Sequence, residues 1–413
     1  MNAASTSSPS VPDASAGAGL PPRQPGLDLL RALAIGLVFL YHYQVFVSKA
    51  PTFGWLGNIG WTGVDLFFVL SGYLIGHQVF AGVARGQTLS VPAFYARRLL
   101  RTMPAFWVVL ALYFLFPAVM GGKTPPPLWR FLSFTQNWNL QPGTAFSHAW
   151  SLCIEEQFYL VLPLLVWLGL RAAAAWHLRV STLWGVLAAL TLMAMAWRAS
   201  LWDQFGREVE AGGVGTQGYY PAVYYATLSR IDEFIPGIAV ALWRHAHPAR
   251  WATAMARGRI WFAGACAVVA LVWYGVAQHY YIDGYGYGRF MTVAGYSLIA
   301  WGYAALVVAA LCSDSPLRQW RVPGAGALAA WSYSIYLTHK AVAVNVAQSL
   351  ASWSLPQPVV IVLVSLACVF AGWVLYRVVE KPVMRWRDRQ VPTLFPPTGG
   401  TQGDAGGSSA ALR

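Results

Sequence analysis

The sequence predicts an all-α integral membrane protein, a bundle of about ten transmembrane helices with both termini in the cytosol. Of its 413 residues, 57% are hydrophobic and only 10% are charged, and the mean hydropathy is +0.48. Such a composition excludes an ordinary soluble domain. The apolar residues gather into stretches long enough to cross a bilayer. The expected spans are 28–47, 61–80, 104–120, 149–169, 181–202, 229–243, 260–278, 291–312, 328–351 and 357–379.

The net charge of +13 indicates orientation rather than nucleic-acid binding. An even number of spans puts both termini on one side, and with the N-terminus inside, most of the 28 Lys and Arg fall in cytosolic segments. The 21 Trp and 20 Tyr are typical of belts at the two bilayer interfaces. We therefore expect membrane lipids, and no nucleic acid, among the partners.

Three regions follow from composition. Residues 1–25 and 390–413 are rich in small and polar residues and are predicted to be disordered tails. The first tail lacks the charged start and apolar middle of a signal peptide. Residues 26–389 form the predicted transmembrane domain. The four cysteines lie in or at the ends of spans with no ligand-like spacing, so we expect no metal and no disulfide framework.

The first span carries the most informative pair, Arg31 and His42. Ionisable groups at membrane depth are costly and usually serve a task. Eleven residues of helix place the two side chains on nearly the same face, about 16 Å apart along the axis. A cation near the cytosolic rim with an imidazole deeper in the bilayer suits a long anionic cofactor that enters from the cytosol.

A basic segment, Arg97, Arg98 and Arg101, precedes the third span. Arg97 and Arg101 share a face if the segment is helical, and Pro104 suits the first turn of the span that follows. Guanidinium groups bind phosphate oxygens in bidentate fashion, but a positive anchor at lipid head groups has the same composition. Both readings stay open from these residues alone.

Two adjacent carboxylates, Glu155 and Glu156, lie about two turns inside the fourth span. They point about 100° apart, and each needs a partner or a proton at that depth. One of them could orient the imidazole of His42 or bind a substrate hydroxyl. The alternative is a structural ion pair, for instance with Arg198 or Arg230.

Further polar residues lie near the outer ends of spans. Asp65 is near the outer end of the second span, and Arg230 stands beside Asp232 and Glu233 at the start of the sixth. The charges at the sixth span predict a salt-bridged cluster, with substrate contact as the other reading. Trp150 opens the fourth span and is a further candidate for substrate contact.

The ninth span carries Tyr336, His339 and Lys340. The first two share a helix face, and Lys340 at mid-span needs a carboxylate partner. Polar contacts between helices and a role in a site are both open readings.

Two outer segments are candidates for contact with an acceptor. Residues 120–147 form the longest outer connection after the second span, and we expect its polar and aromatic run to pack over the outer mouth. The four tyrosines at 219, 220, 224 and 225 suit sugar stacking, but an interfacial aromatic belt is the preferred reading.

In this order the motifs are specific, and the chain resembles the membrane-bound acyltransferase-3 family, here from about Gly26 to about Arg385. The motifs that carry the resemblance are Leu27–Ala34 with His42, Gly63–Ile75, Arg97–Arg101 before Pro104, Trp150–Tyr159, Ser334–Leu337 with His339, and Glu380–Pro382.

The resemblance implies transfer of an acyl group, often acetyl, from cytosolic acyl-CoA to a hydroxyl. It implies that Arg31 and His42 are the essential pair and that the basic loop faces CoA. The family often has a second histidine after this position, where this chain has Tyr43. A localisation in the bacterial inner (cytoplasmic) membrane also follows from it.

Many relatives carry a fused extracytoplasmic hydrolase-like domain. Here only a short Gly- and Ser-rich tail follows Arg389, so we expect a chain without that domain, with direct transfer or a separate extracytoplasmic transferase both open. In the expected reaction, neutral His42 takes the proton of the acceptor hydroxyl, and Glu155 or Glu156 orients the imidazole or holds the acceptor. An acyl-histidine intermediate is a less favoured variant.

The expected acceptor is a cell-surface or lipid-linked glycan. The alternatives are a small hydrophobic acceptor such as a macrolide, a proton-coupled transporter that uses His42, Glu155, Glu156 and Lys340 as a relay, and a non-catalytic scaffold.

Overall fold

The computed structural model describes residues 24–87, 89–176, 179–206, 218–278 and 288–395. Of the expected tails, 1–25 and 390–413, residues 1–23 and 396–413 lie outside the described residues. Residues 24–25 and 390–395 are described, and there the expectation of disorder is wrong: Pro25 begins α1, Gln390 ends α17, and the Ser90 amide donates to the Leu394 backbone oxygen at 2.9 Å. Within the described ranges the regular elements are all helices, which confirms the all-α prediction.

The first half of the chain contributes seven labelled α-helices. They are α1 (Pro25–His42), α2 (Gly54–Ile59), α3 (Gly63–Ala84), α4 (Val91–Leu115), α5 (Leu128–Leu132), α6 (Trp150–Trp176) and α7 (Val180–Leu201). The remaining helices are α9 (Thr227–Arg230), α10 (Ile235–Ala246), α11 (Pro248–Met255), α12 (Gly258–Gln278), α13 (Tyr296–Leu311), α14 (Pro316–Gln319), α15 (Ala325–Leu350), α16 (Gln357–Leu375) and α17 (Lys381–Gln390).

Eight helical segments of the described chain are long and apolar enough to cross a membrane, and they match eight of the ten expected stretches. The chain is a multi-pass membrane protein. The two other stretches, 229–243 and 328–351, are not among the eight. The first is occupied by α10, whose 12 residues span only about 18 Å. The second is occupied by α15, whose 26 residues are long enough but include several polar side chains.

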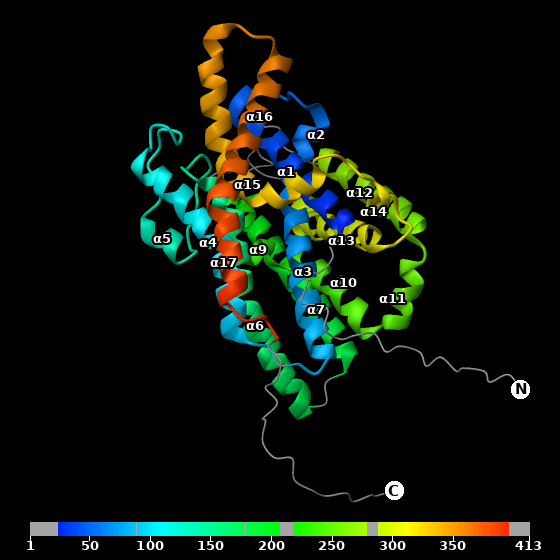
Figure 1. Ribbon diagram of the computed structural model, residues 1–413. Coiled ribbons are helices and arrows are strands. Elements are labelled where there is room, and N and C mark those ends of the chain that lie inside the picture. The colour runs from blue at the N-terminus through cyan, green and yellow to red at the C-terminus, as the bar shows by residue number, and fades with distance from the viewer. Residues whose placement is uncertain (1–23, 88, 177–178, 207–217, 279–287, 396–413) are drawn as a thin grey trace, which may run out of the picture.

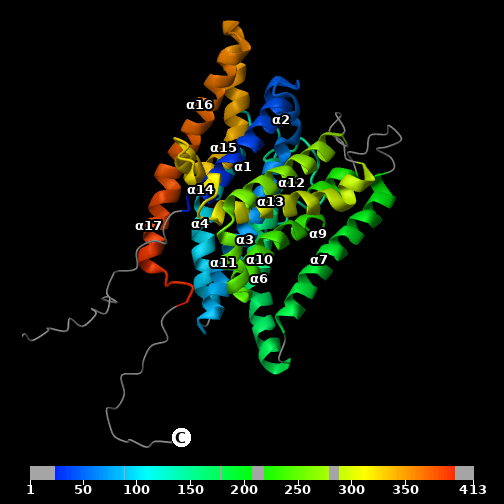
Figure 2. The same ribbon diagram turned by 90° about the vertical axis from the view of Figure 1, so that its right-hand side faces the viewer.

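Helices α1 and α3 lie in the middle of the bundle (Figures 1 and 2). Helix α1 packs against α15 and α3, and α3 packs against α10. Helices α15 and α16 pack together and project beyond the other helices at one end, whereas α6 and α7 extend furthest at the opposite end (Figure 2). The central position of α1 places both Arg31 and His42 inside the bundle.

The contact between α3 and α10 depends on two glycines. A Cβ at Gly72 would collide with the backbone oxygen of Phe234, and a Cβ at Gly237 would collide with that of Val69. Small residues let helix backbones approach closely, and these two glycines permit that approach between α3 and α10.

The expected start of the third span near Pro104 is wrong. Helix α4 begins at Val91, where the Ser90 hydroxyl accepts a hydrogen bond from the Ala93 amide at 3.4 Å and Pro92 occupies the first turn. Pro104 lies inside the helix. The Ser-Val-Pro start outweighs the later proline because it supplies both a cap and a pre-set φ angle. The basic segment is therefore helical, with Arg97 and Arg101 one turn apart.

Candidate active site

Two cavities meet at a shared wall near the centre of the bundle. The arginine cavity, about 460 Å³, is lined by Arg31, Arg98 and Arg101. The histidine cavity, about 720 Å³, contains His42 in its lining. Val64 of α3 and Tyr336 of α15 border both cavities. Arg31 and His42 thus lie on opposite sides of one wall, as their separation of about 16 Å along α1 requires.

The imidazole of His42 meets that of His339 edge to edge, nitrogen to nitrogen. The ring centroids lie 4.9 Å apart with the planes inclined by 10°, and His42 Nδ1 lies 2.6 Å from His339 Nε2. His42 is the last residue of α1, and a π-helical segment, Tyr43–Ser48, follows it. Departures from α-helical hydrogen bonding of this kind often occur at functional sites.

The hydrogen bonds assign the tautomers of this pair. His339 Nδ1 lies 3.1 Å from the carbonyl oxygen of Ile335 and 2.9 Å from that of Tyr336. Carbonyl oxygens only accept, so Nδ1 of His339 carries the proton and its Nε2 accepts from His42 Nδ1–H. Neutral His42 then has a lone pair on Nε2, the nitrogen that a general base needs.

A third imidazole, that of His148, completes the cluster. Its ring centroid lies 6.1 Å from that of His42 and 5.4 Å from that of His339. His148 belongs to the short helical turn Ser147–Ala149 that precedes α6. No role was predicted for His148 from the sequence. Its position next to Ala149-Trp150 at the start of an apolar span was the available signal.

The expectation that a glutamate of α6 orients His42 is wrong. Glu155 lines the arginine cavity, and its Oε1 accepts a hydrogen bond from the Ser71 hydroxyl at 2.9 Å. Glu156 is buried and lines neither this cavity nor the histidine cavity. Neither forms an ion pair with Arg198 or Arg230, whose carboxylate partners are elsewhere. Neighbouring helices, rather than helical register alone, decide which group an inward-facing carboxylate meets.

The arginine cavity has three guanidinium groups in its wall. Arg31 pairs with Asp28 at 3.3 Å, Arg101 pairs with Glu380, and Arg98 lies over the ring of Tyr159 at 4.5 Å. Glu380 also accepts a hydrogen bond from the Ser334 hydroxyl at 2.7 Å. The closing Glu380–Pro382 motif therefore connects α4 to α15.

Arg97 was expected to join these cations, and it does not line the cavity. Its guanidinium donates to Asp388 at 2.7 Å and to the backbone oxygen of Val391 at 3.1 Å. Arg97 and Arg98 are adjacent on a helix, so they point about 100° apart.

Aromatic side chains line the histidine cavity, among them Trp150, Tyr220, Tyr224 and Tyr225. All four are buried, as is Tyr219, so the preferred reading of the tyrosines as an interfacial belt is wrong. Pro142 and Gly143 of the connection 120–147 also contribute to the lining, whereas the polar and aromatic run at 125–138, which was expected to cover the mouth, does not.

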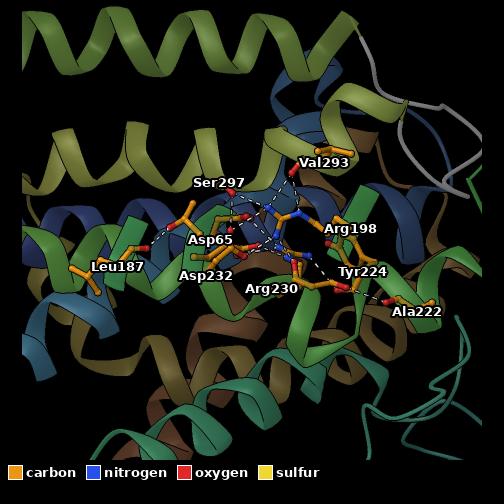
Figure 3. Close-up of polar contacts among 12 residues, drawn as sticks. Asp65, Leu187, Arg198, Ala222, Tyr224, Arg230, Asp232, Val293 and Ser297 are labelled. Carbon is orange, nitrogen blue, oxygen red and sulfur yellow. Dashed lines mark hydrogen bonds and ion pairs between the residues drawn. The ribbon is translucent and has the colours of Figure 1, made fainter. Parts of the chain in front are cut away.

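Beside this cavity lies a buried network of charges (Figure 3). Arg230 pairs with Glu233 and, at 3.1 Å, with Asp65. Arg198 donates to both oxygens of Asp232, at 2.7 and 3.1 Å. The predicted cluster at the sixth span is confirmed, and it extends to α3 and α7.

The reading of Asp65, Asp232 and Glu233 as substrate contacts is wrong. Their exposed fractions are 0%, 1% and 0%, and the two arginines occupy their carboxylates. Arg230 joins the network to the cavity wall, since it lies 4.9 Å from the ring centroid of Tyr224 and 5.1 Å from that of Trp150. The network therefore stabilises the aromatic side chains that line the cavity.

Among the described residues, Lys340 has no carboxylate partner of the kind that was expected. Its Nζ donates to the Ser147 hydroxyl at 3.2 Å and lies 4.0 Å above the ring of Phe46. No cluster of metal-ligating side chains occurs within the residues that the structure describes.

Comparison with known protein families matches residues 24–377 to an acyltransferase domain. The chain belongs to this acyltransferase family. The match covers the first helix, both cavities and α15, so the histidine pair and the arginine cavity lie within the family's domain. No solved structure matches this acyltransferase.

Curated relatives of this acyltransferase include a peptidoglycan O-acetyltransferase of Listeria monocytogenes, 30% identical over 52% of this chain and 33% of the relative. A putative peptidoglycan O-acetyltransferase of Bacillus subtilis is 31% identical over 53% of this chain and 33% of its own length. An O-acetyltransferase of Staphylococcus aureus is 33% identical over 34% and 24% respectively. The alignments thus span a third or less of each relative.

Proposed function

We propose that this acyltransferase moves an acetyl group from acetyl-CoA in the cytosol to a hydroxyl group of a glycan on the other side of the membrane. One observation carries the proposal: the Nδ1–H group of His42 donates a hydrogen bond to His339, and Nε2 of His42 is left free to act as a base at the histidine cavity. The arginine cavity ends at the same wall.

The arginine cavity suits the donor. CoA carries several phosphates, and Arg31, Arg98 and Arg101 offer guanidinium groups of matching geometry. The phosphates would bind there, and the pantetheine arm would carry the thioester toward Val64 and Tyr336. The acyl group would then approach His42 from the side opposite the acceptor.

The reaction requires only a base and a positioned nucleophile. Nε2 of His42 takes the proton of the acceptor hydroxyl while its oxygen attacks the thioester carbonyl. The carbon–sulfur bond breaks, the ester forms, and the proton on His42 passes to the leaving CoA thiolate. His339 stabilises the imidazolium by accepting from Nδ1–H throughout.

The histidine cavity suits a sugar. Aromatic faces stack on sugar rings, and Trp150, Tyr220, Tyr224 and Tyr225 line the cavity. Relatives named as peptidoglycan O-acetyltransferases support a glycan acceptor. The corresponding location is a bacterial cytoplasmic membrane, and a separate extracytoplasmic transferase is a candidate partner.

The test is acyl transfer in inside-out membrane vesicles supplied with labelled acetyl-CoA. We expect wild type to move label from CoA to an extractable glycan and His42→Ala to transfer none above background. Label in a small hydrophobic product would show that the acceptor is a molecule such as a macrolide and not a glycan. Counterflow of substrate without consumption of acetyl-CoA would indicate a transporter and overturn the proposal.

A further inference from the structure

A second outer cavity, which we call the lysine cavity, lies beside the histidine cavity. It has a volume of about 730 Å³, within the usual range for small-molecule sites. The chain contains only four lysines, and three of them, Lys49, Lys123 and Lys340, line this one cavity. They come from three separate segments: the end of the π-helical segment after α1, the connection after α4, and α15.

Within the part of the chain that the structure describes, none of the three lysines has a carboxylate partner. Neither the lysine cavity nor the histidine cavity has an Asp or Glu in its lining. Lys340 contacts only a hydroxyl and an aromatic ring, those of Ser147 and Phe46. A partly buried ammonium without a counter-ion is costly, because its hydration is lost and no opposite charge replaces it.

The position of Lys340 relates this charge to the candidate base. Lys340 follows His339 directly in α15, and His339 holds His42. The two cavities share Phe46, Lys49 and Gly143 in their walls. The two cavities therefore adjoin, so a molecule bound in the lysine cavity would lie next to the histidine cavity.

A positive anchor at lipid head groups is the other reading of outer lysines. It accounts for Lys49 and Lys123, which are both exposed. It does not account for Lys340, which is half-buried, lies ten residues before the end of α15 and borders the cavity. Convergence of three cations on one cavity, with no anion in its wall, is the arrangement of an oxyanion site.

We propose that the lysine cavity binds an anionic group of the acceptor, a carboxylate or phosphate oxygen, and so positions the acceptor's hydroxyl at His42. The inference rests on the proposed function, because it assigns a chemical class to the acceptor of that reaction. The acceptor is accordingly an acidic glycan, and a neutral sugar binds poorly.

The test measures binding without an acyl donor, so that it is independent of catalysis. The full chain, in nanodiscs of zwitterionic lipid, is titrated by calorimetry with N-acetylglucosamine, N-acetylmuramic acid, which adds a carboxylate, and N-acetylglucosamine 1-phosphate, which adds a phosphate. We expect at least one acidic sugar to bind about tenfold or more tightly than the neutral one, and the better of the two identifies the group.

Lys340→Met should abolish that preference, Lys340→Arg should keep most of it, and Lys123→Gln, at an exposed position, should reduce it several-fold. Lys381→Met is the matched control, because it removes the one lysine outside the cavity. Equal binding of neutral and acidic sugars, or an undiminished preference in both Lys340→Met and Lys123→Gln, would overturn the proposal. So would loss of the preference when phosphatidylglycerol is added, since the site would then belong to a lipid head group.

Failure of this inference is distinguishable from failure of the reaction. Vesicles that transfer acetyl groups while the chain binds acidic and neutral sugars equally would overturn the acidic acceptor alone. The opposite result is a protein that never consumes acetyl-CoA but prefers acidic sugars through Lys340. That result would overturn the proposed acetyl transfer and leave the anion-binding role of the lysine cavity standing.

Discussion

His42 Nδ1 and His339 Nε2 lie 2.6 Å apart, although 297 positions of sequence separate the two residues. The backbone of α15 determines the direction of this hydrogen bond, because two carbonyl oxygens hold the proton on Nδ1 of His339. In the proposed reaction, His42 is therefore the base and His339 its support.

We expect His42→Ala to lower kcat by about 10²- to 10⁴-fold, the usual contribution of a general base. His339→Ala should lower kcat by a smaller factor and leave the KM for acetyl-CoA within about twofold, because His339 touches His42 and not the donor. The double variant, His42→Ala with His339→Ala, should be no slower than His42→Ala alone, because His339 acts only through the imidazole of His42. Independent, multiplying losses in steady-state kinetics would contradict the pairing.

The arginine cavity predicts a contrast between two adjacent residues. Arg98→Met should raise the KM for acetyl-CoA about tenfold or more through the loss of a charge-assisted contact. Arg97→Met should change it less than about twofold, because Arg97 is occupied by Asp388 and Val391 outside the cavity. Titration of acetyl-CoA at fixed acceptor checks both variants. An equal effect of the two would show that the donor lies elsewhere.

The buried network predicts a loss of stability at Arg198. Arg198→Met leaves the Asp232 carboxylate buried without its partner, which typically costs about 3–5 kcal/mol in the free energy of unfolding. Arg198→Met combined with Asp232→Leu should recover much of this loss, because neither charge remains. Arg85→Met, at an exposed position, is the control and should change stability by less than about 0.5 kcal/mol. Denaturant unfolding in detergent micelles measures all three.

The packing of α3 on α10 predicts different outcomes for two glycines. Gly72→Ala forces a methyl group against the Phe234 backbone, which cannot yield as a side chain would, and should cost about 1–3 kcal/mol. Gly36→Ala in α1 meets no atom within 4 Å and should be neutral or slightly stabilising, since alanine favours the helix. Thermal unfolding followed by tryptophan fluorescence compares them. Equal melting temperatures for the two variants would contradict the close approach.

Several features of the fold were readable from local sequence. Apolar stretches of about twenty residues identified all eight candidate spans, because the bilayer imposes a length and a composition on each helix separately. The charges at 230–233 also predicted an ion-paired cluster, because neighbouring groups of opposite charge rarely stay apart in an apolar medium. Local information failed at α4, where two competing start signals, Pro92 and Pro104, lie on one helix.

By itself, the sequence determined that the chain crosses a membrane many times and that His42 and the arginines near α4 are chemically out of place there. Only the tertiary structure decided which groups meet: His42 with His339 rather than a glutamate, Asp65 with Arg230 rather than a substrate, and Lys340 with Ser147 rather than a carboxylate. The physical reason is that the hydrophobic signal is a property of one segment, whereas each polar contact joins helices that are distant in sequence. Register and rotation of those helices are set by packing across the whole bundle, as at Gly72 and Gly237, and no single segment contains that information.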